Sequence, residues 1–586
     1  MLSPPRPSAP ALSAGVLIAL ALAPLWLVGT LGRGLWTPDE PREADIAWRM
    51  SLQADRTLPQ LAGTPFLEKP PLSYWLSAAA LTLFGDSAPA ARAPNLLYAP
   101  VAALAVGALA LAMQTEVLGA VLAALVAMSA LLAFRVSVWL APDAALLAGC
   151  AVALLGAWCG YRARPGAPKA AGYALMHCGA AFGFMAKSAP AWLVPGLALL
   201  TLIAWERRWS ELRRWELYAG LALEALIIGP WVLAVARSAQ GVEALRALFW
   251  HNLVGRFTRV AAPVALDYTS GHRNSPGKYL LELPVYLLPW TLIVAAALAH
   301  AWRGARTPGV AGTPWRFALA ACLPFLALLS LAATARDIYA APALLGFGLL
   351  AGLWAQAARR APLPFDRRAV RLTGWLVLLM VWALGAALGV LAAAGAGPRA
   401  RCLGAALAAI AAAQVAVLLG ARAARRGDLA GSLGWAFGGY AAALCLVAAA
   451  ALPIVDRWQD LPQLARRIHA DTLQRPLALL DPDETTIAML DHGLNTPFTI
   501  VTSGAGHPST VVGAWLGGHG RKACVLVLLP GHAPGRLSAF LARFRPSAAP
   551  GDGVAGELVA AGAAVILERY QLPQGRRYAL LGAPSG

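Results

Sequence analysis

Apolar runs of roughly 20 residues recur along the first 452 residues, and each can cross the hydrocarbon core of a bilayer as an α-helix. Only 13% of the 586 residues are charged, against about 25% in soluble globular chains. We therefore predict an all-α polytopic membrane protein with about 13 transmembrane helices. The predicted spans lie near residues 11–31, 96–113, 118–140, 144–161, 172–186, 189–205, 217–236, 283–301, 315–333, 340–358, 372–394, 403–420 and 432–452.

The first run, Ala11 to Leu31, is interpreted as a span rather than a signal peptide. Its only basic neighbour on the N-terminal side is Arg6, it has no clear cleavage site, and many further runs follow it.

Five short connections between predicted spans are rich in arginine, and with thirteen spans all five fall on one side. The positive-inside rule identifies that side as cytoplasmic. These basic loops and their attraction to anionic lipid account for the formal net charge of +19, so no nucleic-acid partner is expected. The N-terminus is then inside, and the chain after Pro453 is outside. The connections are RARPGAPK (162–169), ERRWSELRRWE (206–216), RGAR (303–306), RRAPLPFDRRAVR (359–371) and ARAARRGD (421–428).

The opposite side carries a first loop (32–95), a middle loop (237–282) and the tail. Residues 1–452 are predicted to form the transmembrane domain, with these two loops forming the active site, and residues 453–586 a small α/β domain. In that tail, β-like runs at 476–481, 523–530 and 563–570 alternate with helical stretches such as GRLSAFLARF (535–544).

Ionisable residues gather on this outer side, at the ends of several predicted spans. TPDEPREADIAWRM opens the first loop with Asp39 and Glu40, and FLEKPPL follows with Glu68 and Lys69. Later stretches add Asp143 in WLAPDAAL, Lys187 in FMAKSAP, His251 and Arg256 in FWHNLVGRFTR, and Arg336 and Tyr339 in ATARDIYAAP.

Each of these residues also has a structural interpretation. Asp39 and Glu40 could form a solvated loop or a helix cap, and Asp143 could cap the fourth span. Lys187 could extend to the headgroups, and His251 could be an interfacial anchor beside Trp250. Their convergence on one face favours a functional site, because ionisable groups at membrane depth pair and mark such sites.

Acids and bases together suit a phosphate-linked lipid substrate. Lysine and arginine hold phosphate oxygens, while a carboxylate can accept a proton or, with others, hold a divalent ion. No Walker, Rossmann or HExxH motif occurs, and the cell exterior offers no nucleotide pool, so a lipid-borne donor is favoured.

Two motifs of the first loop resemble a known family. W-x-x-D-E-x-R (Trp36 to Arg42) with F-x-E-K-P-P-L-x-Y-W (Phe66 to Trp75) is similar to the lipid-to-lipid glycosyltransferases of the aminoarabinose transferase family. These are relatives of the dolichyl-phosphate-mannose protein mannosyltransferases, with the GT-C fold. The resemblance implies inverting transfer of a sugar from undecaprenyl phosphate to lipid A or another envelope acceptor, at the periplasmic face of the bacterial inner membrane.

Roles follow from the matched positions. The resemblance implies that Asp39, Asp143 and Glu40 are catalytic residues, with Asp39 as the catalytic carboxylate or as part of a pair with Asp143. It also implies that Glu68 and His251 are candidate ligands of a divalent metal. The donor phosphate would be bound by Arg42, Lys69, Lys187, Arg256 and Tyr339. Two consecutive prolines restrict φ after Lys69 and would hold the Glu68–Lys69 pair at a fixed height.

Three departures from the family pattern leave the sugar and the acceptor open. Glu43 replaces a tyrosine, QADRTLPQLAG lacks a tryptophan, and Arg336-Asp337 replaces a lysine. Transfer of 4-amino-4-deoxy-L-arabinose to lipid A is the leading expectation, and a protein or another envelope glycan is the alternative acceptor. Two alternatives belong to other classes of protein: a flippase for lipid-linked sugar, and a scaffold whose tail binds a partner. The flippase, as a transporter, is disfavoured because the charges lie at span ends and the sequence shows no internal repeat. A monomer is expected.

Overall fold

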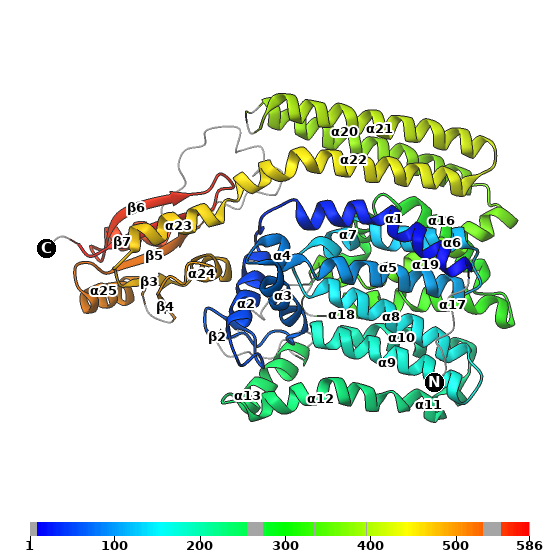
Figure 1. The fold of residues 1–586 in the computed structure, drawn as a ribbon, viewed down its shortest axis with the longest axis horizontal. Helices are drawn as coiled ribbons and strands as arrows, with labels where there is room; N and C mark the ends of the chain where they lie inside the picture. The colour runs from blue at the N-terminus through cyan, green and yellow to red at the C-terminus, as the bar shows by residue number, and fades with distance from the viewer. Residues whose placement is uncertain are drawn as a thin grey trace.

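The computed structural model describes residues 9–584 except 255–273, 276, 333, 335, 394, 396, 505–506 and 531–552. It is an elongated helical bundle with a small α/β domain at one end (Figure 1). We call that end of the bundle the site end. The long helices α20 (Asp366–Ala393), α21 (Arg399–Arg425) and α22 (Leu429–Trp458) lie together along one side, and α22 leads into the C-terminal domain.

The rest of the bundle is built from shorter helices. They are α1 (Ala9–Leu31), α5 (Asn95–Ala112), α6 (Val117–Ser129), α7 (Leu131–Val138), α8 (Asp143–Arg162), α9 (Ala167–Lys187), α10 (Pro190–Glu206), α11 (Trp215–Ala219), α12 (Leu221–Arg237), α15 (Lys278–Tyr286), α16 (Thr291–Gly304), α17 (Thr313–Ala320), α18 (Leu323–Leu331) and α19 (Ala343–Arg360).

Every predicted span lies on one of these helices or on a pair of them, and the chain is a multi-pass membrane protein. By length and composition, eight helical stretches of the described chain could cross a membrane, or up to ten if each bent pair is one span. The bent pairs are α6 with α7, at 70°, and α15 with α16, at 115°. The three remaining predicted spans correspond to α9, α10 and α19.

Glycines allow α8 and α9 to pack with their backbones in contact. A Cβ at Gly156 would lie 2.1 Å from the backbone nitrogen of Met176, and one at Gly172 would lie 2.3 Å from that of Gly160. Small residues at such spacings are typical of close helix pairs in membranes. Because the two helices are antiparallel neighbours, the start of α8 meets the end of α9, which places Asp143 beside Lys187.

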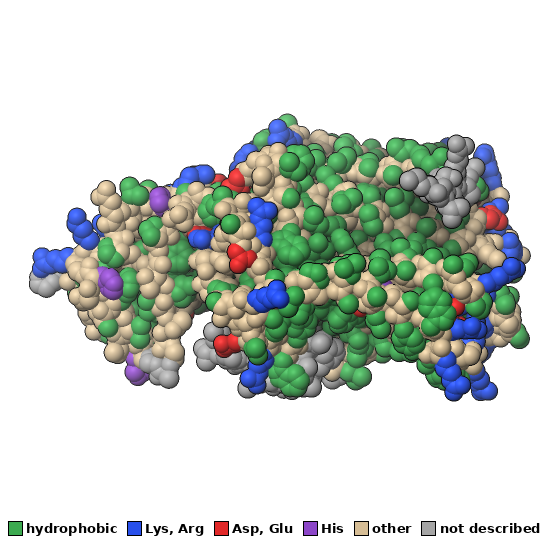
Figure 2. All heavy atoms as spheres, turned by 60° about the horizontal axis from the view of Figure 1, so that its bottom comes forward, with side chains coloured by type: hydrophobic (Ala, Val, Ile, Leu, Met, Phe, Trp, Pro, Cys, Tyr) green, Lys and Arg blue, Asp and Glu red, His purple; other side chains and the backbone are tan. Residues whose placement is uncertain are grey.

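The predicted grouping of the basic loops on one side of the bundle is present in the structure. Figure 2 shows an apolar belt over the helical part, with Lys and Arg side chains gathered at the end farthest from the C-terminal domain. The five arginine-rich connections are the loops of that end, so all five do lie on one side of the bundle.

The first loop folds into a compact layer between the bundle and the C-terminal domain (Figure 1). It contains α2 (Glu40–Leu52), the two-stranded β1–β2 ribbon (Gln60–Leu61 and Thr64–Pro65), α3 (Leu72–Phe84) and α4 (Ala88–Arg92). The middle loop contributes α13 (Gly241–Leu245) and a π-helical stretch, Arg246–Val254.

The C-terminal domain is a five-stranded sheet with helices, as predicted for an α/β tail. Its strand order is β4-β3-β5-β7-β6; β3 pairs in parallel with β4 and β5, while β7 is antiparallel to β5 and β6. The three predicted strands are present as β3 (Leu477–Leu480), β5 (Cys524–Leu529) and β6 (Val565–Gln571). The predicted helix at 535–544 lies outside the described residues. The other elements are β4 (Thr499–Val501), β7 (Arg577–Gly582), α23 (Leu461–Thr472), α24 (Glu484–Asp491), α25 (Pro508–His519) and α27 (Gly553–Ala560).

Candidate functional site

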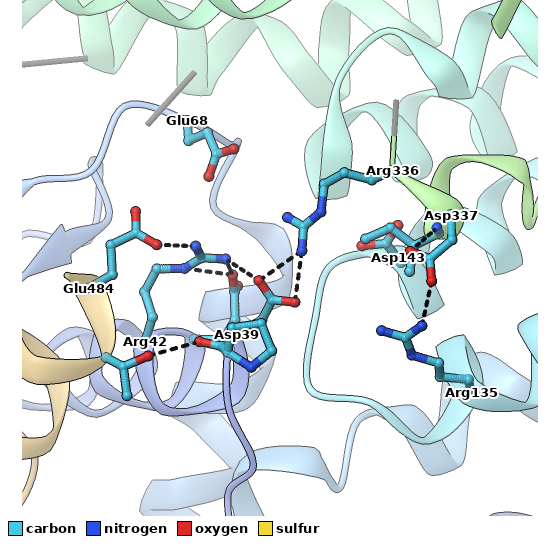
Figure 3. Close-up of polar contacts among 12 residues, drawn as sticks. Asp39, Arg42, Glu68, Arg135, Asp143, Arg336, Asp337 and Glu484 are labelled. Carbon is cyan, nitrogen blue, oxygen red and sulfur yellow. Dashed lines mark hydrogen bonds and ion pairs between the residues drawn. The ribbon is translucent and has the colours of Figure 1, made fainter. Parts of the chain in front are cut away.

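Asp39 lies at the first turn of α2, between two arginines. Arg336 donates to both of its carboxylate oxygens, at 3.1 and 3.0 Å, and Arg42 lies 3.5 Å away (Figure 3). The side chain of Asp39 does not cap α2, so the helix-cap interpretation is wrong. Burial alone would raise its pKa, but the charges of Arg42, Arg336 and Lys69 outweigh that effect and hold the pKa below its usual range. Asp39 is therefore ionised at neutral pH.

Glu43 is the centre of a second set of contacts. Its carboxylate accepts from Lys69 at 2.8 Å and from Arg42 at 2.5 Å, and Lys69 also lies 3.6 Å from Glu68. Burial opposes the charge of Glu43, yet Lys69 and Arg42 lower its pKa. Burial likewise opposes the charge of Lys69, while Glu43 and Glu68 raise its pKa. The departure from the family pattern at residue 43 therefore supplies the carboxylate that fixes both cations.

Asp143 and Lys187 form a third pair. The Lys187 ammonium donates to the buried carboxylate of Asp143, and it lies 5.0 Å from the centre of the Tyr339 ring. Asp143 is the first residue of α8 but makes no capping hydrogen bond, so the cap interpretation of this residue is also wrong. Lys187 points to a protein carboxylate rather than extending to lipid headgroups.

These groups line two adjoining cavities at the site end, of about 90 and about 10 Å³. Both cavities are lined by Glu68, Lys69, Asp143, Lys187 and Tyr339, and the smaller one adds Asp39, Arg42, Glu43 and Arg336. The larger cavity also has apolar walls, formed by Leu146, Leu193, Phe325, Leu328 and Leu329. The lining therefore suits a molecule with one anionic end and one hydrocarbon end.

Glu40 does not belong to this cavity. It is fully buried on another side of α2, where it binds Arg33, lies 3.7 Å from Arg92, and accepts from the backbone nitrogens of Trp36 and Leu140, each at 2.9 Å. Its surroundings are those of a structural carboxylate that ties α2 to α4 and to the segments that follow α1 and α7.

Two predicted site residues cannot be placed. Arg256 lies outside the described residues, and the backbone of His251 lies in the π-helical stretch while its side chain is outside the description. Among the described residues no three His, Cys, Asp or Glu side chains form a group that could hold a metal ion. Glu68 and His251 as metal ligands therefore stay a prediction.

The C-terminal domain adds one carboxylate that the sequence did not indicate. Glu484, the first residue of α24, binds Arg42 on the side away from Asp39 (Figure 3). Thr485 donates to the backbone oxygen of Pro38 at 3.2 Å. The sequence held only a weak signal for this contact. DETT at 483–486 is typical of a helix start, but nothing in it identifies Arg42, more than 400 residues away, as the partner of Glu484.

A family described as dolichyl-phosphate-mannose-protein mannosyltransferase matches residues 68–233. An undecaprenyl phosphate-alpha-4-amino-4-deoxy-L-arabinose arabinosyl transferase of Edwardsiella ictaluri is 31% identical over 50% of this chain and 51% of its own length. A protein of the same name from Pseudomonas aeruginosa is 31% identical over 57% of this chain and 58% of its own. The chain thus spans a little over half the length of the relatives it matches.

Solved structures extend the likeness to the fold. The crystal structure of ArnT from Cupriavidus metallidurans bound to undecaprenyl phosphate has a TM-score of 0.69 to this chain, with 18% identity and 98% of each chain covered. The apo form of that protein gives a TM-score of 0.68 over the same coverage. This chain is similar in sequence, over about half of its length, to proteins named as aminoarabinosyl transferases, and its GT-C fold is shared with the ArnT crystal structure over nearly all of the chain.

Proposed function

We propose that this protein is an inverting glycosyltransferase of the bacterial inner membrane. It moves a sugar from an undecaprenyl-phosphate donor to an acceptor at the periplasmic face, and its specific reaction is transfer of 4-amino-4-deoxy-L-arabinose to lipid A. The observation that carries the proposal is the cavity that combines Lys69, Lys187 and Asp143 with an apolar wall. The names of the relatives support the same donor class and sugar.

The donor would place its phosphate among the cations and its hydrocarbon chain along Phe325 and Leu329. Within the described lining, the four cations Arg42, Lys69, Lys187 and Arg336 face the four carboxylates Asp39, Glu43, Glu68 and Asp143. The cations are thus already paired inside the protein, and an arriving phosphate must replace a carboxylate. Lys187 is the cation that we expect to change partner. When its ammonium binds the phosphate, the carboxylate of Asp143 is released at the edge of the cavity.

Transfer with inversion needs an acceptor oxygen to attack the anomeric carbon opposite the phosphate. The bond from that carbon to the phosphate oxygen breaks, its electron pair stays on the leaving polyprenyl phosphate, and Lys69, Lys187 and Arg256 stabilise the added charge. A hydroxyl acceptor would give its proton to Asp39 or Asp143. A phosphate acceptor is already anionic, and Asp39 would then orient it through Arg336.

We further propose that the C-terminal domain lies in the periplasm and that the protein acts as a monomer. A divalent ion held by Glu68 and His251 at the rim would supply further positive charge near the phosphate. A protein or another envelope glycan remains the alternative acceptor.

Reconstitution tests the proposal. In proteoliposomes supplied with undecaprenyl-phosphate sugar and lipid A, the wild type should form glycosylated lipid A and release undecaprenyl phosphate. Asp39→Asn and Lys69→Ala should lower the rate by about 10²-fold or more, as expected for groups that stabilise a transition state. Asp55→Asn, an exposed carboxylate of the same loop, is the matched control and should keep wild-type rates.

Wild-type turnover by both variants would contradict the assignment. A flippase would move the lipid-linked sugar across the bilayer without cleaving it, so intact donor on the opposite leaflet would favour that alternative. Mass spectrometry of envelope lipids from a deletion strain would identify the sugar and the acceptor together.

A further inference from the structure

A second groove lies on the other side of the bundle, between α1, α7, α20 and α22. It encloses about 390 Å³, and α1, α7 and α22 supply most of its lining. Its deeper part is apolar, formed by residues such as Leu25, Val28, Leu384, Leu444, Val447 and Leu452. Because these helices are part of the membrane-spanning bundle, the acyl chains of a lipid can pack against this apolar surface.

The groove becomes polar toward the site end. Arg33, Trp36, Arg135 and Trp139 line it there. The Arg33 guanidinium lies 4.5 Å from the Trp36 ring centre and 5.0 Å from that of Trp139, and Arg135 lies 5.7 Å from Trp139. Tryptophan and arginine together are typical of the headgroup level of a membrane.

Two features at this polar end indicate an anionic headgroup. Arg135 is exposed and its partner Asp337 is partly exposed, so this pair is solvated and a phosphate can replace the aspartate at little cost. The indole N–H of Trp139 is buried and has no hydrogen-bond acceptor among the described residues. A phosphate oxygen supplies the acceptor that this donor lacks.

One short segment connects this groove with the cation-lined cavity. Arg336 holds Asp39, and the next residue, Asp337, holds Arg135 (Figure 3). A headgroup at Arg135 therefore lies on one side of a two-residue segment, and the carboxylate predicted to be catalytic lies on the other.

We propose that this groove holds the acceptor: a lipid with acyl chains and a phosphate-bearing headgroup, with its chains between α1, α7 and α22 and its phosphate at Arg135 and Trp139. That this lipid is the acceptor depends on the proposed function, whereas the existence of the lipid site does not. Each substrate then has its own amphipathic cavity, and the two headgroups meet at Arg336–Asp337.

Photolabelling without any donor tests the lipid site. The probe is phosphatidic acid with a photoreactive acyl chain, in phosphatidylcholine proteoliposomes, with labelled residues mapped by mass spectrometry. The wild type should be labelled on α1, α7 and α22. Ala448→Trp, which fills the groove, should lower this labelling about tenfold, equivalent to a modest loss of binding energy. Ala449→Trp, on the next and exposed residue of α22, should leave it unchanged.

Two further arms test the headgroup and the identity of the lipid. Arg135→Gln, at an exposed side chain, should remove the preference for phosphatidic acid over a photoreactive diacylglycerol. An excess of undecaprenyl phosphate should not reduce the labelling. Equal labelling of Ala448→Trp and Ala449→Trp, equal labelling by diacylglycerol in the wild type, or full competition by undecaprenyl phosphate would each overturn the proposal.

In the transfer assay, Ala448→Trp should raise the KM for the acceptor and leave the KM for the donor unchanged. If no sugar transfer is found while the labelling pattern holds, the proposed function has failed and the anionic-lipid site stands. If transfer is found with no groove labelling, only the inference about the groove has failed.

Discussion

Asp39 and Glu40 are adjacent in the sequence but have different surroundings, and each should respond differently to loss of its charge. Glu40 is fully buried and is the carboxylate bound by Arg33 and close to Arg92. Glu40→Gln leaves these cations without their counter-charge and should cost roughly 3–5 kcal/mol of stability. Thermal unfolding in detergent should show a clearly lower midpoint for Glu40→Gln than for Asp39→Asn.

The transfer assay completes that comparison. Asp39→Asn should keep the melting temperature within a few degrees and lose transfer. If Glu40→Gln instead melts like the wild type and loses transfer, Glu40 acts in catalysis, as the family resemblance implied, and its structural role here is wrong.

Arg336 should set the pH range in which Asp39 is active. Its guanidinium contributes to the low pKa of Asp39, so Arg336→Gln removes a stabilising positive charge and should raise that pKa. The acid limb of the pH–rate profile should therefore move to higher pH in this variant. The check is kcat/KM measured between pH 4 and 8, and an acid limb at the wild-type position would show that Arg336 does not tune Asp39. The conservative Arg336→Lys should restore part of the shift.

Between elements, α2 and α24 meet beside a buried carboxyl group, Asp45, that titrates. Arg49 binds Asp491, and Asp45 lies beside them with no exposed surface. Burial, together with the neighbouring Asp491 carboxylate, raises the pKa of Asp45 from 3.8 to about 9. The folded protein therefore holds a proton on Asp45 at neutral pH that the unfolded chain has lost.

Stability should consequently fall as pH rises between those two pKa values, by at most about 1.4 kcal/mol per pH unit. Asp45→Asn imitates the protonated form and should make the apparent melting temperature nearly constant from pH 6 to 8.5, and higher than the wild type at pH 8.5. Asp55→Asn should keep the wild-type slope, because Asp55 has a lowered pKa and does not titrate in this range. A wild-type melting temperature that is independent of pH would contradict the proton on Asp45.

The elements themselves were largely predictable from local pattern. Each apolar run that was predicted to be a span lies on a helix or a pair of helices, although α9, α10 and α19 are not among the eight to ten stretches that could cross a membrane by length and composition. β-branched and aliphatic runs gave β3, β5 and β6. β4 was missed because it has three residues, and β7 because its aliphatic run, Ala579 to Leu581, is equally short and is flanked by Arg577, Tyr578 and Gly582. The pairing of Arg42 with Glu484 could not be predicted, since no periodicity links residues 442 positions apart.

For the whole molecule, the strongest sequence prediction was the end of the bundle at which the ionisable site residues gather. Arginine-rich loops predict the orientation of every span at once, and therefore the side on which each span end lies. What the sequence could not supply is how the C-terminal domain reaches the site. α22 continues from the bundle to Trp458, and the residues at its end contact the segment before Asp39. Asp456 accepts from the Gly34 nitrogen at 2.9 Å and the Trp36 indole at 2.7 Å, and Gln459 accepts from the Thr37 nitrogen at 3.0 Å.

Two truncations separate these contacts from those of the domain itself. Removing residues 461–586 keeps Asp456 and Gln459 but loses Glu484 and Asp491, whereas removing 456–586 loses all four. Because Asp456 and Gln459 hold the segment that leads into Asp39, transfer should fall in both variants and fall further in the longer deletion. The measurement is the initial transfer rate per mole of inserted protein, with insertion checked by labelling of single cysteines in the basic loops. Wild-type rates after removal of residues 456–586 would mean that the bundle alone positions Asp39 and that the C-terminal domain serves another purpose.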